Sequence, residues 1–401
     1  MRNKKLANTL AVCFAPLPLA ISLATASLVS PVVQAACTPA FSPGASVTCS
    51  GSMLGITSAV NNLQVTIASG AMIQPAVVNT GSVVTLTGNN TTFINHGRVD
   101  PTLLIGLAVR TSGVRIGNTN NSIVNVTNNG ILRGSSDLSD FNGPLANVTG
   151  VALHVQNGFG GTTTINNNGT LDGAAILGYS IAASDIPVIA VTGGGEVRLT
   201  NGMLGTIIGR VALQGSVRGN TFTNAGALTG SVSMGSGGGA NTFNAVTGSS
   251  VLKGGGQAGQ QSVTGQPLLT FAATGIVDGG VGGSNNLVLK NSATDDGSGT
   301  AGSGTVSSDT FINFSNLIVH SGTWTLLGPM LGAASTTTLN GGVLRFDNSG
   351  AFGSGLITGN GGNLQAAVSG LNLANNISIG AGGLTVSGAN TLGLTGGLTG
   401  T

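Results

Sequence analysis

Apolar and polar residues alternate along this chain in short runs, which are separated by glycine, asparagine, serine and threonine. Alternation with a period of two, rich in β-branched residues, is typical of short β-strands. Runs of this kind include residues 63–67, 83–87, 122–127, 196–199 and 343–346. Beyond residue 50 we find no convincing apolar spacing of an amphipathic helix. The pattern therefore predicts an all-β protein.

A recurrent phrase connects these runs: an apolar residue is followed by asparagine, glycine and a second apolar residue. It is clearest in residues 93–99, 126–134 and 165–173. The glycines of its six copies are Gly97, Gly130, Gly169, Gly202, Gly226 and Gly275. Their unequal spacing excludes a repeat of fixed length, but it suits a solenoid whose rungs carry loops of different length on one side.

We predict that the chain forms a right-handed parallel β-helix, with two or three strands in each rung. Glycine adopts left-handed backbone angles freely and asparagine does so better than most residues, so we expect the Asn-Gly phrases to form sharp corners. Rungs stack about 4.8 Å apart, so inward Val, Ile and Leu would form a narrow core. Outward Thr, Ser and Asn would form side-chain ladders. At about 22 residues a turn, residues 36–401 would make roughly 16 rungs.

The N-terminal residues 1–35 have the three-part pattern of a cleavable signal peptide. Arg2, Lys4 and Lys5 are followed by an uncharged stretch that ends in small residues, so we expect cleavage between Ala35 and Ala36. A retained transmembrane helix is the alternative, because the apolar run is long enough to span a bilayer. Three prolines interrupt the run and no basic cluster follows it, which favours cleavage and export.

Composition excludes several classes of protein. Of 401 residues, 69 are glycine, 40% are hydrophobic and only 6% are charged. Collagen would need glycine at every third position, and disorder by charge repulsion would need a high net charge. Removing residues 1–35 leaves 10 basic and 11 acidic residues. We therefore expect no nucleic-acid partner, since no basic block remains.

Two cysteines remain after the signal, Cys37 and Cys49. An exported chain enters an oxidising compartment, so we expect them to form a disulfide. A loop of this size would contribute about 3 kcal/mol to stability in the chain-entropy model. No Cys-x-x-Cys pair suggests a reactive thiol. We assign residues 36–57 to an N-terminal cap that contains this disulfide.

The C-terminal third carries phrases that point to a family. Residues 311–328 combine a Phe-containing turn, a short apolar strand and the sequence Thr323-Trp-Thr-Leu326. Residues 336–365 contain two Gly-Gly-x-Leu strands, which flank Ala351-Phe-Gly-Ser-Gly355. This part resembles the autotransporter-associated β-strand repeat, and Val47-Thr-Cys-Ser-Gly51 is similar to the start of many autotransporter passengers. We assign residues 58–284 to an irregular β-helix and 285–401 to repeats of this family, truncated.

The resemblance implies a passenger that inner-membrane secretion machinery exports and that reaches the surface of a Gram-negative bacterium. An outer-membrane barrel is the family's usual partner. A barrel needs strands of about ten residues and aromatic girdles, and this sequence has one Trp and one Tyr. We therefore expect the chain to be a truncated copy or a fragment, or the barrel to be encoded elsewhere; if no barrel is supplied, the chain would stay in the periplasm.

Candidate chemistry is sparse. His96, His154 and His320 show no zinc-ligand spacing, and no Gly-Lys-Ser/Thr phosphate loop or Gly-x-Ser-x-Gly elbow occurs, so we expect no metal or cofactor. β-Helical enzymes that act on carbohydrates would need clustered carboxylates. The candidate pairs are Asp137 with Asp140 and Asp295 with Asp296, all in Gly/Ser-rich loops that a solvated turn also explains.

Two classes of function remain. The first is a non-enzymatic adhesin or scaffold that presents loops to surfaces, matrix or carbohydrate ligands. We expect its contact region at about 135–190, where inserts carry Phe141, Phe159 and Tyr179. The second is a secreted carbohydrate-active β-helix enzyme of the polysaccharide lyase or hydrolase type. The low number of carboxylates favours the first class.

Overall fold

The computed structural model describes residues 36–75, 81–101, 111–135, 150–173, 187–252, 259–263, 266–332 and 335–400. The chain divides into two units, Met1–Val33 and Gln34–Thr401, and only the second contains described residues. Every strand or helix assigned among them is a β-strand, so the all-β prediction is confirmed. The expected signal segment, including Ala35, lies outside the described residues, whereas Ala36 begins the first strand.

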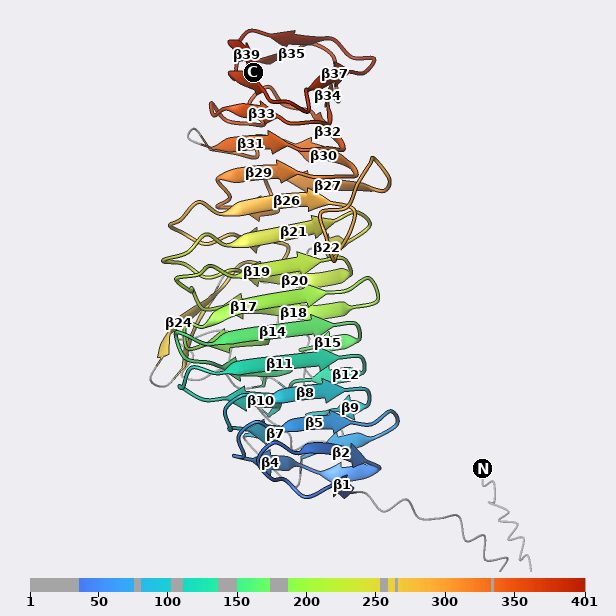
Figure 1. The fold of residues 1–401 in the computed structure, drawn as a ribbon, viewed down its shortest axis with the longest axis vertical. Helices are drawn as coiled ribbons and strands as arrows, with labels where there is room; N and C mark the ends of the chain where they lie inside the picture. The colour runs from blue at the N-terminus through green and yellow to red at the C-terminus, as the bar shows by residue number, and fades with distance from the viewer. Residues whose placement is uncertain are drawn as a thin grey trace, which may run out of the picture. The chain divides into compact units, whose positions relative to one another are not determined.

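A first sheet of 15 strands runs the length of this unit (Figure 1). Its first pair is antiparallel, and every later pair is parallel. Its strands, in spatial order, are β1 (Ala36–Thr38), β2 (Ser46–Ser50), β5 (Gln64–Ile67), β8 (Thr92–Asn95), β11 (Ile123–Asn128), β14 (Thr162–Asn167), β17 (Glu196–Asn201), β19 (Thr221–Asn224), β21 (Thr242–Val246), β26 (Asn286–Lys290), β29 (Asn316–Val319), β31 (Thr336–Leu339), β33 (Ile357–Gly359), β36 (Ile377–Ile379) and β39 (Leu398–Gly400).

A second 15-stranded sheet contains two rows of strands that merge. One row is β3 (Ser52–Leu54), β6 (Met72–Gln74), β9 (Arg98–Val99), β12 (Ile131–Arg133) and β15 (Thr170–Asp172). The other is β4 (Ile56–Ser58), β7 (Ser82–Leu86), β10 (Ser112–Gly117), β13 (Leu153–Gln156) and β16 (Pro187–Thr192). Both rows pair with β18 (Thr206–Leu213), which pairs with β20 (Ala227–Ser233). The sheet continues through β22 (Ser250–Leu252), β25 (Val277–Asp278) and β28 (Phe311–Ile312).

Where the two rows merge, β18 and β20 each contain a glycine, and these two glycines are stacked. Gly209 of β18 lies opposite Gly230 of β20, and their φ angles are 134° and 157°. L-residues rarely adopt such angles. In the rungs before β18, a connecting segment separates the two rows at this place, so one corner of the stack carries most of the long connections.

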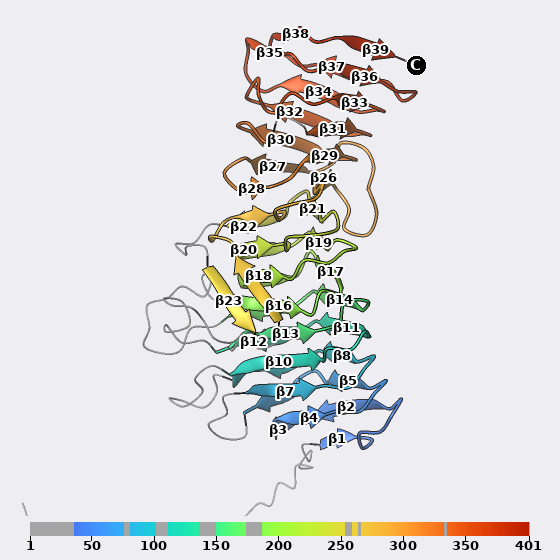
Figure 2. The same cartoon turned by 90° about the vertical axis from the view of Figure 1, so that its left-hand side faces the viewer.

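The last part of the second unit forms a third sheet (Figure 2). Its strands are β27 (Ser303–Ser307), β30 (Thr323–Leu327), β32 (Val343–Phe346), β34 (Asn363–Ala366) and β37 (Thr385–Ser387), and beside it β35 (Leu371–Leu373) pairs with β38 (Leu392–Leu394). Rungs here are regular: Asn316 and Thr336 contact each other across 20 residues. Asn241 and Asn285, in adjacent rungs of the middle part, are 44 residues apart. The stacked parallel sheets are consistent with a β-helix, or solenoid, of variable rung length.

A hairpin covers part of the outer face of the second sheet. It consists of β23 (Gly259–Val263) and β24 (Gln266–Phe271). Leu269 of β24 packs against Ala190 and Ala212 of the sheet. The Ser231 hydroxyl donates to the carbonyl oxygen of Ala272 at 2.8 Å, and the Ala272 amide donates to the Ser233 hydroxyl at 2.8 Å.

The first end of the stack is closed by an antiparallel strand. β1 pairs with β2 in the register Cys37 to Cys49, and the two cysteines form a disulfide. An antiparallel edge of this kind blocks continued parallel stacking, which is how native sheets protect their edges. The segment 36–57, expected to be a cap, contains this arrangement.

Inward positions form continuous apolar rows, because strands such as β5, β8, β11 and β14 alternate buried and partly exposed residues. One such row aligns Val65, Phe93, Val126 and Ile165 in successive rungs, all of which are buried. Burial of each such side chain contributes about 1.5–3 kcal/mol. Outside, Thr242, Asn286, Asn316 and Thr336 form the predicted side-chain ladder, with distances of 2.7–3.2 Å.

A second ladder lies inside the stack, which the sequence pattern did not predict. One asparagine of each of five Asn-Gly phrases is fully buried, and the amides are stacked rung over rung. Each Nδ2 donates to the next Oδ1 at 2.8–2.9 Å. The members are Asn95, Asn128, Asn167, Asn201 and Asn224.

The reason for glycine in these phrases also differs from the expectation. Gly97, Gly130, Gly169 and Gly226 do not have left-handed backbone angles. Instead, a Cβ on any of them would lie 2.1–2.4 Å from a carbonyl oxygen of the preceding rung. Close approach of stacked backbones, not a positive φ, therefore requires glycine here. The sixth phrase lies elsewhere, since the amide of Gly275 donates to Gly230 in β20.

Candidate functional site

One corner of the stack carries exposed apolar side chains. It is formed by the connections that lead from the second sheet into the first at residues 157–161, 214–220 and 279–285. Phe159, Val217 and Val281 are 61%, 52% and 69% exposed. We call these three residues the apolar corner. Aligned apolar side chains on a polar surface are typical of an interaction site.

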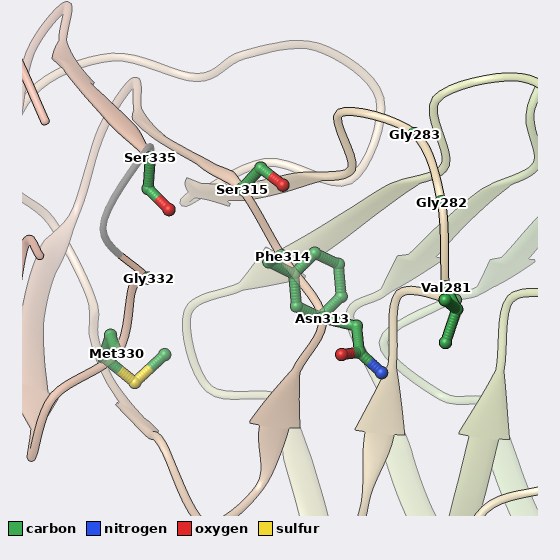
Figure 3. Close-up of a pocket in the computed structure, with 10 residues that line it drawn as sticks. Val281, Gly282, Gly283, Asn313, Phe314, Ser315, Met330, Gly332 and Ser335 are labelled. Carbon is green, nitrogen blue, oxygen red and sulfur yellow. The ribbon is translucent and has the colours of Figure 1, made fainter.

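A groove lies at the Val281 end of the apolar corner (Figure 3). Its volume is about 430 Å³. The short connection Asn313-Phe314-Ser315 between β28 and β29 forms its floor. Longer connections of the two neighbouring rungs form its walls, with Val281–Gly283 on one side and Met330, Gly332 and Ser335 on the other. The groove exists because a short connection lies between two longer ones.

Amide and carboxylate groups hold the floor and one wall together. Asp278 Oδ1 accepts hydrogen bonds from the Gly280 amide at 2.8 Å and from Asn313 Nδ2 at 2.7 Å. Asn285, which is 1% exposed, donates from Nδ2 to the carbonyl oxygens of Gly280 at 2.7 Å and Asn313 at 3.0 Å. These bonds fix the groove in one shape before any ligand enters. All the residues that line it are uncharged.

The second candidate pair of carboxylates lies in the connection between β26 and β27. Asp295 Oδ1 accepts a hydrogen bond from the Gly297 amide at 2.7 Å. The hydrogen bond with the Ser292 side chain, and then that with Gly297, lowers the pKa of Asp295. A general acid needs a raised pKa, so this carboxylate is suited to closing a turn. Asp137 and Asp140 lie outside the described residues.

Asp296 belongs to a small cluster of charged and titratable groups. Its Oδ2 lies 3.7 Å from Nδ1 of His320, which follows β29. Lys290 is 7% exposed at the end of β26, and burial lowers its pKa, an effect that Asp296 and Asp295 oppose. No three His, Cys, Asp or Glu residues within the described ranges are grouped closely enough to hold a metal ion.

A larger set of charges stabilises the outer face of the second sheet. Asp100 is fully buried and lies between Arg98 and Arg133. Its Oδ2 is 2.8 Å from Arg98 Nε and 3.3 Å from Arg133 Nη1. Arg133 Nε also contacts Asp172 Oδ2 at 2.9 Å. Three consecutive rungs are thus joined by alternating charges, which is a structural arrangement like the neutral ladders.

The expected contact region is only partly described. Phe141 and Tyr179 lie outside the described residues, whereas Phe159 belongs to the apolar corner. Val217, Val281 and the groove were not predicted from the sequence. Two signals could have found the groove: the glycine run at 279–283 and the short interval between the strands at 311–312 and 316–319.

His154 is the buried histidine, and it lies within β13 as the alternation predicts. One of its ring nitrogens, Nε2, lies 3.3 Å from the Thr192 hydroxyl. Burial, assisted by the nearby charge of Arg115, lowers the pKa of His154 from 6.5 to about 4. His96 follows β8 in an exposed ladder with Asn129.

We expect His154 to make the fold less stable in mild acid. The folded state favours the neutral ring, so its contribution is complete above pH 6.5 and is lost as the pH falls towards 4, where the folded form is also protonated. The loss would amount to about 3 kcal/mol. Urea unfolding of wild type and His154→Gln from pH 7.5 to 4 measures it. Parallel pH profiles of the two proteins would contradict this role.

The described residues include no helix with the length and apolar character needed to cross a membrane. Compared with known proteins, the chain shows no significant match to a protein-family model, to a curated protein or to a solved structure.

Proposed function

We propose that this chain is an exported, non-enzymatic adhesin or scaffold, the passenger of an autotransporter, and that its sheets wind as a right-handed parallel β-helix. Support comes from the basic and apolar start of the sequence, the phrases of residues 311–365 and the stacked parallel sheets. Export would remove residues 1–35 and leave Ala36 at the N-terminus. N-terminal sequencing of the exported protein checks this step.

The observation that carries the adhesive function is the apolar corner. Phe159, Val217 and Val281 are exposed along one edge of a stack that has very few charges. A surface of this kind gains free energy by covering apolar area. Its outward ladders of amides and hydroxyls supply hydrogen bonds without the cost of desolvating charges. A long stack can repeat such contacts over several rungs.

Adhesion of protein-coated beads to a bacterial or host-cell layer tests the function. We expect Phe159→Ser combined with Val217→Ser to reduce the bound fraction at least five-fold, since two exposed apolar contacts contribute about 1 kcal/mol or more. Met203→Ser with Leu204→Ser is the matched control. These two residues are 81% and 83% exposed, but they lie in the connection from β17 to β18, at another corner.

Equal losses in both double variants, or no adhesion by the wild type, would count against the proposal. Point substitutions are preferable to deleting residues 135–160, because such a deletion removes β13 from the second sheet.

An enzymatic alternative is favoured by one observation: Lys290 is buried beside Asp295 and Asp296, and burial lowers its pKa. A lysine whose pKa is lowered is a candidate general base in polysaccharide cleavage. This alternative requires the wild type to cleave polygalacturonate and Asp296→Ala to lose that activity. Without cleavage by the wild type, the alternative fails.

A further inference from the structure

We propose that the groove between Val281–Gly283 on one side and Met330, Gly332 and Ser335 on the other binds a neutral saccharide chain. The inference rests on the proposed adhesive function and adds to it a ligand class and a place. The groove lies beside Val281, so a ligand on its floor continues the apolar corner. Its volume of about 430 Å³ falls within the range of small-molecule sites.

The lining has the two-sided chemistry that a sugar ring requires. Val281, which is 69% exposed, supplies apolar surface at one wall, and Phe314 and Met330, which are 6% and 8% exposed, add only a small area. Asn313, Ser315 and Ser335 supply an amide and hydroxyls. A neutral sugar has apolar C–H faces and hydroxyl edges. Its faces can pack on this apolar surface, and its edges can exchange hydrogen bonds with the polar side chains.

Charge decides which saccharides fit. All the lining side chains are uncharged. The nearest carboxylate that the hydrogen bonds reveal, Asp278, already accepts from Gly280 and Asn313. An acidic saccharide would therefore lose its hydration and gain no cationic partner. The groove accordingly selects uncharged sugars.

Geometry favours a saccharide over an extended peptide. The walls are turns, not edge strands, so a peptide could not add to them as another strand. The walls belong to rungs two steps apart, which places their backbones about 10 Å from each other. This leaves space for one chain, held by side chains and not by a backbone ladder.

The site is already formed without ligand. Asn313 has a left-handed φ of 61°, and its backbone carbonyl and side-chain amide are both tied to the neighbouring rung. A rigid site loses little conformational entropy on binding. The connections therefore form the groove before any ligand binds, and binding does not require a loop to become ordered.

The test uses the full chain, titrated against hexasaccharides of glucose, mannose and N-acetylglucosamine, with a galacturonate hexasaccharide and an alternating Thr-Val decapeptide as comparators. We expect at least one neutral hexasaccharide to bind. Ser315→Trp fills the groove and should raise its Kd at least ten-fold. Ser378→Trp is the matched control, a half-buried outward serine of β36 away from the groove, and should leave Kd unchanged.

Asn313→Gly provides a second variant that keeps the left-handed turn and removes the side-chain amide together with its hydrogen bond to Asp278. We expect it to raise Kd about three- to ten-fold. Binding only of the galacturonate or the peptide, no binding of any neutral hexasaccharide, or an unchanged Kd in Ser315→Trp would each overturn the proposal.

The bead assay separates the two proposals. If wild-type beads adhere and Ser315→Trp beads adhere equally, with no hexasaccharide binding, the groove proposal fails and adhesion stands. If hexasaccharide binds and Ser315→Trp abolishes binding while wild-type beads do not adhere, the groove proposal holds and the adhesive function fails.

Discussion

Asn167→Ala should lower the free energy of unfolding by about 2–4 kcal/mol. Asn167 is in the middle of the buried ladder: its Oδ1 accepts from Asn128 and its Nδ2 donates to Asn201, both at 2.8 Å. Alanine would leave the Oδ1 of Asn201 without this donor and would open a small cavity. A buried polar atom that loses its partner costs more than the bond contributed, because water cannot replace it.

The neighbouring Asn168 is the matched control. It is exposed, and its Nδ2 donates to Asn129 at 3.3 Å, so Asn168→Ala should cost less than about 1 kcal/mol. Urea unfolding of the full chain, followed by circular dichroism, measures both variants. If both variants lose a similar amount of unfolding free energy, the buried ladder contributes no more to stability than the exposed one.

Gly169→Ala should strongly destabilise the stack, although it adds only a single methyl group. The new Cβ would lie 2.1 Å from the carbonyl oxygen of Gly130 and 2.8 Å from the amide nitrogen of the same residue. Both atoms belong to the backbone, so the two rungs would have to separate. Separation would also weaken the bond from the Thr170 amide to that carbonyl oxygen, now 2.8 Å long. We expect a loss of about 4 kcal/mol or more.

Gly370→Ala distinguishes close packing from backbone strain. Gly370 has a φ of 83°, and nothing lies within 4 Å of the position that a Cβ would take. Alanine at this position would lower the free energy of unfolding only by the cost of the left-handed conformation, about 1–2 kcal/mol. The yield of folded protein and its resistance to protease compare the two variants. If Gly370→Ala is the more damaging, backbone angle and not rung contact decides where glycine is needed.

Much of the architecture could be predicted because its determinants are local. Alternation within each run defines strands, and the turn residues between runs define corners, as at residues 83–87 and 343–346. The repeat of 20 residues near Asn316 and Thr336 is visible in the sequence as well. None of these features requires knowledge of which rung lies above which.

The inner ladder could not be predicted, because its energetics depend on stacking between rungs. Asn128 and Asn167 are 39 residues apart, and nothing local marks them as partners. The weaker phrase of Gly275 has Thr274 in place of asparagine, and Gly275 stacks on Gly230 instead. An asparagine before glycine is compatible with an exposed turn or a buried stack, and only the register between rungs decides.

The candidate site was missed for a related reason. Asn313, Phe314 and Ser315 form a groove floor only because the connections of the adjacent rungs are longer. A difference in length between neighbouring rungs becomes visible once the strands are aligned. Phe159 was singled out from the sequence because it lies in an insert that lengthens the interval from Gly130 to Gly169, whereas Val217 and Val281 carried no such signal.

The regular rungs near the C-terminal end of the described stack also affect how such a chain can change length. Thr337 lies over Leu317, Ile357 over Thr337 and Ile377 over Ile357. Excision of residues 337–356 would bring Ile357 directly over Leu317, and Leu364 over Trp324, with every side chain still on its original face. Gene duplication or loss in units of one rung would thus shorten or lengthen the protein without requiring a new packing solution. The irregular rungs before β26 differ in length from their neighbours. Loss or duplication of one of these rungs would therefore not preserve the alignment of side chains.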